Sequence, residues 1–264
     1  MSRGKNIREL MGIQGLVSSV DMPDWGFIYD VSTVKHPNYN VGDSIDLPDG
    51  RGYRYGLSTS ALATNLGCQF ESSGLIAITT ASTAAAIGDK KVVVPAATHA
   101  ALAKDELRGG YIIIYLNGPA QFRGIIGNDA SVSAAAVTIY LDGPLTIAVT
   151  TSSKFEVFGN PWRYLVQTAG NPNGNGFAGP PAATVSAAAM YFWCQTKGPT
   201  NLAVQSTLTG TNEATAGMWR GDGSIEAIAT ALGATIPTDD TSQYAGYRMG
   251  GNYTDNGPLF MLQG

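Results

Sequence analysis

The sequence predicts an all-β protein: a sandwich- or barrel-like body with an extended N-terminal arm and one or two short helices. Three observations support this fold class. Between residues 74 and 167 the chain consists of short runs rich in β-branched residues, which are typical of strands. Turn sequences such as Gly-Asp, Asn-Gly-Pro and Asp-Gly-Pro separate these runs. No long segment of helical periodicity lies between them, which argues against alternating strands and helices.

Residues 1–43 are expected to form the extended arm. Residues 2–16 are basic and carry apolar residues at near-helical spacing, so they form either one weak helix or an arm that orders on a partner. From residue 18 to 41 the chain has many breakers and little periodicity. Aromatic side chains on such a segment pack onto another surface, either their own domain or a neighbouring subunit. We expect the neighbour, with contacts from Trp25, Phe27, Tyr29 and Tyr39.

A β-rich body is predicted over residues 44–210, and it begins with a hairpin. Pro48-Asp-Gly50 is a turn sequence between two short runs. The second run interleaves basic and aromatic residues: Arg51, Tyr53, Arg54 and Tyr55. Such interleaving occurs in sites that stack nucleic acid bases. Here it favours a half-exposed strand whose polar face lies in water.

The middle of the body is predicted to be a series of strands. The runs are residues 75–78, 91–95, 111–116, 121–126, 137–141, 145–149, 154–157 and 164–167. Two stretches have helical spacing instead. Residues 58–66 predict a short helix or turn. Residues 96–108 contain good helix formers and end at Gly109-Gly110, which is a helix stop.

Three consecutive aromatic residues end at Trp193. Tyr191, Phe192 and Trp193 predict a strand that is buried on at least one face. Lys197-Gly-Pro199 predicts a turn, after which alternating apolar residues from 202 to 208 predict a second strand. We expect the β core to be built around this hairpin.

Two segments flank this hairpin. Residues 168–183 are rich in Gly, Pro and Asn and predict a long exposed loop. Residues 211–264 are expected to form a C-terminal β/loop segment that docks on the body or on a neighbour, with a strand or short helix at 219–230. Its apolar end provides two further candidate contact residues, Leu259 and Phe260.

Composition limits the function classes. Only 14% of the residues are charged, against about 25% in ordinary globular proteins, and the net charge is −4. This surface suits a protein covered by copies of itself or by neighbours, and it has no basic footprint for nucleic acid. Cys68 and Cys194 lie in apolar settings and are interpreted as small buried hydrophobes. No run is long enough to span a bilayer, and no signal peptide is recognised, so synthesis in a cytoplasm is expected.

A search for chemistry in the sequence finds no catalytic, cofactor-binding or metal-binding residues. The chain has two histidines, His36 and His99, and neither has a second ligand at metal spacing. No Gly-x-Ser-x-Gly elbow accompanies a serine, and no carboxylates are paired at a spacing that indicates acid–base work. The protein is therefore predicted not to be an enzyme.

Four stretches carry a resemblance. They read Leu47-Pro-Asp-Gly-Arg-Gly-Tyr-Arg-Tyr55, Leu141-Asp-Gly-Pro-Leu145, Asn160-Pro-Trp-Arg-Tyr164 and Tyr191-Phe-Trp-Cys-Gln-Thr-Lys-Gly-Pro199. In this order they resemble segments of a family of tailed-bacteriophage structural proteins, described as virion or capsid-decoration proteins. The resemblance covers about residues 44–210, and its motifs are structural rather than catalytic.

The resemblance implies a structural role in a tailed-phage particle. The expected function is that of a capsid decoration or cement protein, which binds the capsid exterior and stabilises the head by bridging subunits. The expected partners are the major capsid protein and copies of the chain itself as a homotrimer, without direct contact to nucleic acid or membrane. The expected location is the capsid surface of the virion, after synthesis in the host cytoplasm.

Two other functions stay open. The first is a tail- or head-fibre-like protein that binds host surface glycans, in which Tyr and Trp side chains supply stacking surfaces and the loop at 168–183 carries the site. The second is an enzyme that acts on cell-wall or capsule polymers, which would need paired carboxylates about 5–10 Å apart in a cleft.

Overall fold

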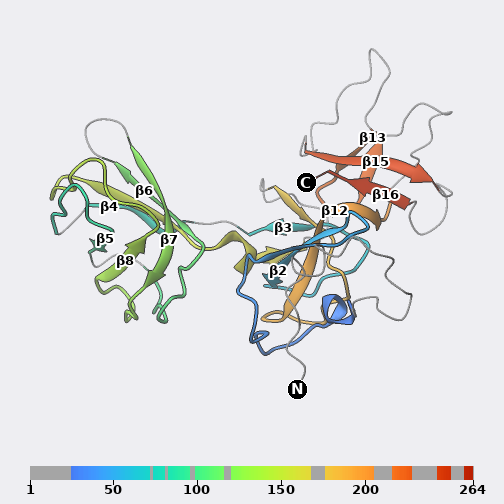
Figure 1. Ribbon diagram of the computed structural model, residues 1–264, viewed down its shortest axis with the longest axis horizontal. Coiled ribbons are helices and arrows are strands. Elements are labelled where there is room, and N and C mark those ends of the chain that lie inside the picture. The colour runs from blue at the N-terminus through green and yellow to red at the C-terminus, as the bar shows by residue number, and fades with distance from the viewer. Residues whose placement is uncertain are drawn as a thin grey trace, which may run out of the picture.

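The protein is all-β, as predicted (Figure 1). The computed structural model describes residues 25–71, 74–80, 83–95, 99–115, 120–167, 176–204, 216–227, 243–250 and 259–263. Within these ranges sixteen strands form three sheets, and the helices are two short 3-10 turns. Neither of these turns has the length or the apolar character that crossing a bilayer requires.

A seven-stranded antiparallel sheet joins the N-terminal and C-terminal parts of the chain. Its order is β1-β2-β12-β16-β15-β13-β14. The strands are β1 (Ser44–Asp46), β2 (Gly52–Leu57), β12 (Tyr191–Asn201), β16 (Leu259–Leu262), β15 (Tyr244–Gly250), β13 (Ala216–Trp219) and β14 (Ile225–Ala227). The predicted Pro48-Asp-Gly50 turn connects β1 to β2, with Gly50 at φ +88°. The C-terminal segment docks on the body because β16 pairs with the end of β12.

A six-stranded antiparallel sheet forms a separate lobe with its own core, here called the inserted lobe (residues 74–158). Its order is β4-β9-β6-β7-β8-β5, and it curls into a half-barrel. The strands are β4 (Gly74–Thr80), β9 (Lys154–Phe158), β6 (Tyr111–Tyr115), β7 (Gln121–Asn128), β8 (Val137–Leu141) and β5 (Lys91–Val94). Inward side chains such as Ile112, Ile139 and Phe155 are fully buried, and no described residue outside the lobe belongs to this cluster.

The inserted lobe interrupts a pair of strands in the remainder of the molecule, here called the main lobe. A three-stranded sheet has the order β10-β3-β11, with β10 at Leu165–Val166, β3 at Cys68–Phe70 and β11 at Phe177–Gly179. The chain leaves β3 for the inserted lobe and returns to β10, which is the antiparallel partner of β3. Glu71 N donates to Tyr164 O at 2.6 Å, so the two connections lie side by side. The predicted single body of residues 44–210 is thus two lobes with separate cores.

β12 is the central strand of the main lobe and is buried on both faces. Phe192 and Cys194 face a cluster with Leu165, while Trp193 faces a cluster with Tyr53 and Tyr55. Phe192 and Trp193 are almost completely buried, and Tyr191 is half-buried. A strand covered on both sides explains the unbroken aromatic run, because neither face has to be polar.

The described part of the arm packs on its own domain. The short helix η1 (Gly26–Tyr29) and the segment that follows bring Phe27 and Tyr39 onto Trp193, with ring centroids 6.0 and 4.9 Å away. Ser32 exchanges two backbone hydrogen bonds with Tyr191. This segment thus covers Trp193 of its own chain, and its contact with a neighbour stays a prediction. Residues 1–24, including the helix or arm predicted for 2–16, lie outside the described residues.

The predicted turn at residues 197–199 is wrong. β12 runs through it to Asn201, with a register shift between Gln195 and Lys197. Gly198 adopts φ +87°, a conformation that glycine tolerates and other residues rarely adopt. Because the chain kinks there without reversing, the same strand pairs first with β2 and then with β16.

Two predictions in the inserted lobe are also wrong. Residues 99–108 form turns instead of a helix, because the Asn128 side chain bonds Leu107 N and Ala103 O and replaces helical partners. Residues 145–149 are not a strand. There the Gln121 carboxamide oxygen accepts from Thr146 N and Ile147 N, in place of a strand partner.

Candidate functional site: an aromatic cleft in the main lobe

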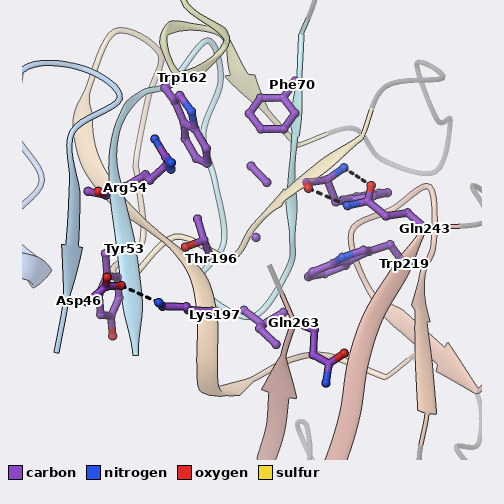
Figure 2. Close-up of a pocket in the computed structure, with 15 residues that line it drawn as sticks. Asp46, Tyr53, Arg54, Phe70, Trp162, Thr196, Lys197, Trp219, Gln243 and Gln263 are labelled. Carbon is purple, nitrogen blue, oxygen red and sulfur yellow. Dashed lines mark hydrogen bonds and ion pairs between the residues drawn. The ribbon is translucent and has the colours of Figure 1, made fainter. Parts of the chain in front are cut away.

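The main lobe contains a cleft between its seven-stranded and three-stranded sheets (Figure 2). Its volume of about 420 Å³ lies in the range of small-molecule sites, roughly 300–1,000 Å³. Aromatic rings and polar side-chain ends line it together. The lining residues are Ser44, Asp46, Tyr53, Arg54, Phe70, Trp162, Phe177, Ala178, Gly179, Thr196, Lys197, Trp219, Gln243, Leu262 and Gln263.

One wall of the cleft is built by Arg54 and Trp162. Alternation along β2 sends Tyr53 and Tyr55 into the core and leaves Arg54 on the opposite, exposed face. The Arg54 guanidinium lies 5.3 Å from the centroid of the Trp162 ring, and its Nη1 donates to Gly42 O at 2.9 Å. These two contacts fix the guanidinium before any ligand arrives.

Asn160 places Trp162 in this wall. Its side-chain oxygen accepts from Trp162 N at 3.0 Å, which caps the short helix η2 (Pro161–Arg163), and Pro161 stands at the first position of that helix. Its Nδ2 donates to Val41 O at 2.8 Å and to Arg108 O at 3.3 Å. One buried amide therefore ties together the arm, the inserted lobe and the cleft wall.

The opposite wall is held by a stacked ring pair. Phe177 of β11 stacks on Trp219 of β13, with ring centroids 5.1 Å apart and planes at 15°. The Gln243 side chain exchanges two hydrogen bonds with the backbone of Phe177, with Phe177 N donating to Oε1 and Nε2 donating to Phe177 O. Both rings are buried, so this wall is rigid.

An ion pair crosses the mouth of the cleft. Lys197 Nζ lies 3.0 Å from Asp46 Oδ1, and the residue between them on β2 is Gly52. A Cβ at Gly52 would stand 2.6 Å from Lys197 Cε and 2.8 Å from Asp46 Oδ1. The absence of a side chain at Gly52 therefore creates the space in which the two charges meet.

The cleft carries one positive charge that no carboxylate neutralises within the described residues. Asp46 is paired with Lys197, whereas Arg54 takes part in none of the ion pairs found there. Phe70 and Trp162 meet edge to face at 5.1 Å and are only half-buried, so ring surface borders the guanidinium. Such a cleft can bind a ligand that combines an apolar face, hydrogen-bonding groups and an anionic group.

Groups with classical catalytic chemistry lie elsewhere. His36 is in the arm, and both ring nitrogens of His99 contact backbone carbonyls in the inserted lobe, at 2.6 and 2.9 Å. Among the described residues no cluster of three His, Cys, Asp or Glu side chains could hold a metal ion. Cys68 and Cys194 are free and buried, as the sequence indicated, with their sulfurs 3.7 Å apart. Burial raises the pKa of Cys194.

The structure disperses the sequence-predicted contact residues. Trp25, Phe27 and Tyr39 pack on the Trp193 cluster, while Tyr29 keeps half of its surface exposed. Leu259 is 48% exposed, but its neighbour Phe260 is fully buried in this chain's own core and does not face a partner. None of these residues lines the cleft.

Sequence reasoning missed the cleft residues, although one signal for them was present. Arg54 was interpreted as the polar face of a strand in water, and it does lie on that face, but at a cleft wall. Part of the loop predicted at 168–183 becomes β11, and Phe177–Gly179 lines the cleft. Residues 168–175 lie outside the described residues. The interleaved arginines and tyrosines were the available signal.

No protein-family model, curated protein or solved structure matches this chain.

Proposed function

We propose that this protein is a structural component of a tailed-phage particle that binds the capsid exterior and bridges capsid subunits. The observation that carries the proposal is the spatial convergence of three of the four stretches that resemble phage structural proteins. The stretch at 47–55 forms β2, the stretch at 191–199 forms the adjacent part of β12, and Trp193 lies opposite Tyr55 in that pair. The stretch at 160–164 places Trp162 against Arg54 of β2. Three of the four stretches thus fall on one contiguous framework, and the fourth, Leu141–Leu145, begins at the end of β8 in the inserted lobe.

The exposed surface also supports a role in assembly. The inserted lobe displays Tyr111 stacked on Phe122, with centroids 5.2 Å apart, and both rings are exposed. Ile126 on the same strand as Phe122 is also exposed. Exposed apolar side chains that gather on one sheet face are typical of surfaces that a partner covers.

The test compares particles with and without the protein. Particles that lack it are expected to form but to release their DNA at a lower temperature in a heating series. Adding back the purified protein should restore the release curve, whereas the variant Phe122→Ser should restore it less well than the matched surface change Val34→Ser. Identical release curves with and without the protein would contradict the proposal.

The cleft favours a second candidate function, the binding of saccharides. A sugar ring has an apolar C–H face that fits against an aromatic ring and hydroxyl groups that need hydrogen-bonding partners. Phe70 and Trp162 offer ring surface, and Thr196 and Gln263 offer polar ends around the same space. Binding of the purified protein to disaccharides, measured by calorimetry, tests this function. A flat titration with every sugar would contradict it.

A further inference from the structure

We infer that the cleft binds a sugar unit that carries a carboxylate, as in a uronic acid, and that Arg54 binds this carboxylate. The inference rests on the saccharide-binding function proposed above and names its ligand class.

The charge balance of the cleft calls for one negative charge. Lys197 and Asp46 neutralise each other at 3.0 Å, which leaves Arg54 as the single unbalanced charge on the lining. Arginine stays protonated at every physiological pH. A ligand with one carboxylate therefore complements the cleft, whereas a neutral ligand leaves the guanidinium charge uncompensated.

The guanidinium is presented in an orientation that suits a carboxylate. Its carbon Cζ lies over the Trp162 ring, 5.3 Å from the ring centroid, and Nη1 donates to Gly42 O at 2.9 Å. No other hydrogen bond to this guanidinium is found among the described residues, so Nε and Nη2 are free to donate side by side. Two parallel N–H donors match the two oxygens of a carboxylate, and a fixed side chain loses little entropy on binding.

The rest of the lining favours a hydroxylated ring over a polyphosphate chain. A polyphosphate chain needs several cations along its length, and the net charge of the protein is −4. A sugar ring instead needs scattered polar groups, which Ser44, Thr196 and Gln263 supply on the same lining as the ring of Phe70.

The experiment measures binding of two matched probes to the full chain by calorimetry. The probes are a galacturonic acid disaccharide and the corresponding neutral galactose disaccharide. We expect the acidic probe to bind more tightly. Arg54→Gln should weaken its binding about tenfold or more, because a hydrogen bond to a charged group is lost, and should leave the neutral probe unaffected. Arg54→Lys keeps the charge but loses the paired donors. Its affinity for the acidic probe should lie between those of the original protein and Arg54→Gln.

The matched control is Arg123→Gln, which removes the same charge from a half-buried arginine of β7 in the inserted lobe, away from the cleft. It should bind both probes like the original protein. Thermal midpoints of the variants show whether they are folded. If Arg54→Gln does not fold, Arg54→Lys still tests the role of the paired donors. Polygalacturonate that competes with the acidic disaccharide would assign the ligand to the interior of a polysaccharide, and a failure to compete would assign it to a short or terminal unit.

The outcomes separate the two proposals. Equal binding of both disaccharides, unchanged by Arg54→Gln, would overturn the carboxylate inference and leave saccharide binding in place. If neither disaccharide binds, both the carboxylate inference and the saccharide-binding function are overturned.

Discussion

Trp193 is covered by three aromatic rings from two parts of the chain. Phe27 and Tyr39 come from the arm, and Tyr55 comes from β2. Only 2% of the Trp193 surface is exposed. A side chain enclosed by several rings leaves a large cavity when it is removed, and the neighbours that come from different segments cannot all move in to fill it.

We therefore expect Trp193→Ala to lower the free energy of unfolding by about 3–5 kcal/mol, in the range for large aromatic residues in cores. Denaturant melts followed by circular dichroism measure this change. The control Val34→Ala truncates a side chain that is 73% exposed and should leave the midpoint nearly unchanged. Equal midpoints for Trp193→Ala and the original protein would remove this residue from the core.

Tyr53 is expected to make the stability of the fold decrease at high pH. Burial raises its pKa to about 12 from the ordinary value of 10.0, although Arg51 opposes the shift. The folded state therefore holds the phenolic proton more tightly than the unfolded state. The stability from this group is complete below pH 10 and is lost as the pH rises towards 12. The denaturant midpoint of the original protein should decrease as the pH is raised from 10 towards 12. The midpoint of Tyr53→Phe should decrease less over the same pH range.

At the scale of the element, Gly198 lets β12 serve two partners. A continuous flat strand would pair with one neighbour along its whole length on each side, whereas the kink at Gly198 directs the second half towards β16. Its positive φ coincides with a close approach to the β1–β2 turn. A Cβ at Gly198 would stand 2.5 Å from Gly50 O and 2.7 Å from Arg51 Cα.

Two glycines with almost the same backbone conformation allow the two effects to be separated. Gly50 has φ +88° and open space around its Cβ position, while Gly198 has φ +87° and faces backbone atoms. Gly50→Ala should cost about 1–2 kcal/mol, the penalty of a left-handed conformation. Gly198→Ala should cost distinctly more, because the backbone of the turn has to shift. Similar costs in thermal melts would mean that the contact is soft.

Single elements also show how far the sequence predicts this fold. All six strands of the inserted lobe are predicted, because β-branched runs between turn sequences depend on local preference alone. Residues 145–149 have the same pattern and form no strand, because Gln121 occupies their backbone donors. The 197–199 segment looks like a turn, since a glycine with positive φ serves a turn and a kink equally well. Such outcomes depend on tertiary partners that no local pattern contains.

The cleft was not predictable for the same reason. Its lining comes from both ends and the middle of the chain, from Ser44 in β1 to Gln263 after β16. Arg54 and Trp162 are more than a hundred residues apart, and each looks ordinary in its own segment. What the sequence did contain was the framework, the β1–β2 hairpin and the aromatic run of β12, which positions these residues.

At the scale of the whole molecule, the two lobes have separate cores and only two chain connections. All the buried residues of the half-barrel core belong to residues 74–158, and the main lobe packs its own clusters around β12. Asn160 adds a bridge between the lobes through Arg108 O. Each lobe thus buries its apolar surface without the other, which is the usual condition for independent folding.

We expect the main lobe to fold after residues 74–158 are replaced by a short Gly-Ser linker, because Glu71 N and Tyr164 O already lie within hydrogen-bonding distance. Far-ultraviolet circular dichroism measures the retained strand content, and tryptophan fluorescence reports on the four tryptophans, all of which lie in the main lobe. The same shortened chain carrying Trp193→Ala serves as the unfolded control. A shortened chain that resembles this control would show that the main lobe needs the inserted lobe.

The side-by-side exit of the two connections also determines how the protein responds to force. Because β3 and β10 are antiparallel and the inserted lobe hangs from the same end of both, a pull on that lobe against the main lobe loads their hydrogen bonds one after another, starting with Glu71 and Tyr164. Peeling of this kind yields at far lower force than shearing a whole ladder at once. Under tension the junction would open first, and both cores would stay intact.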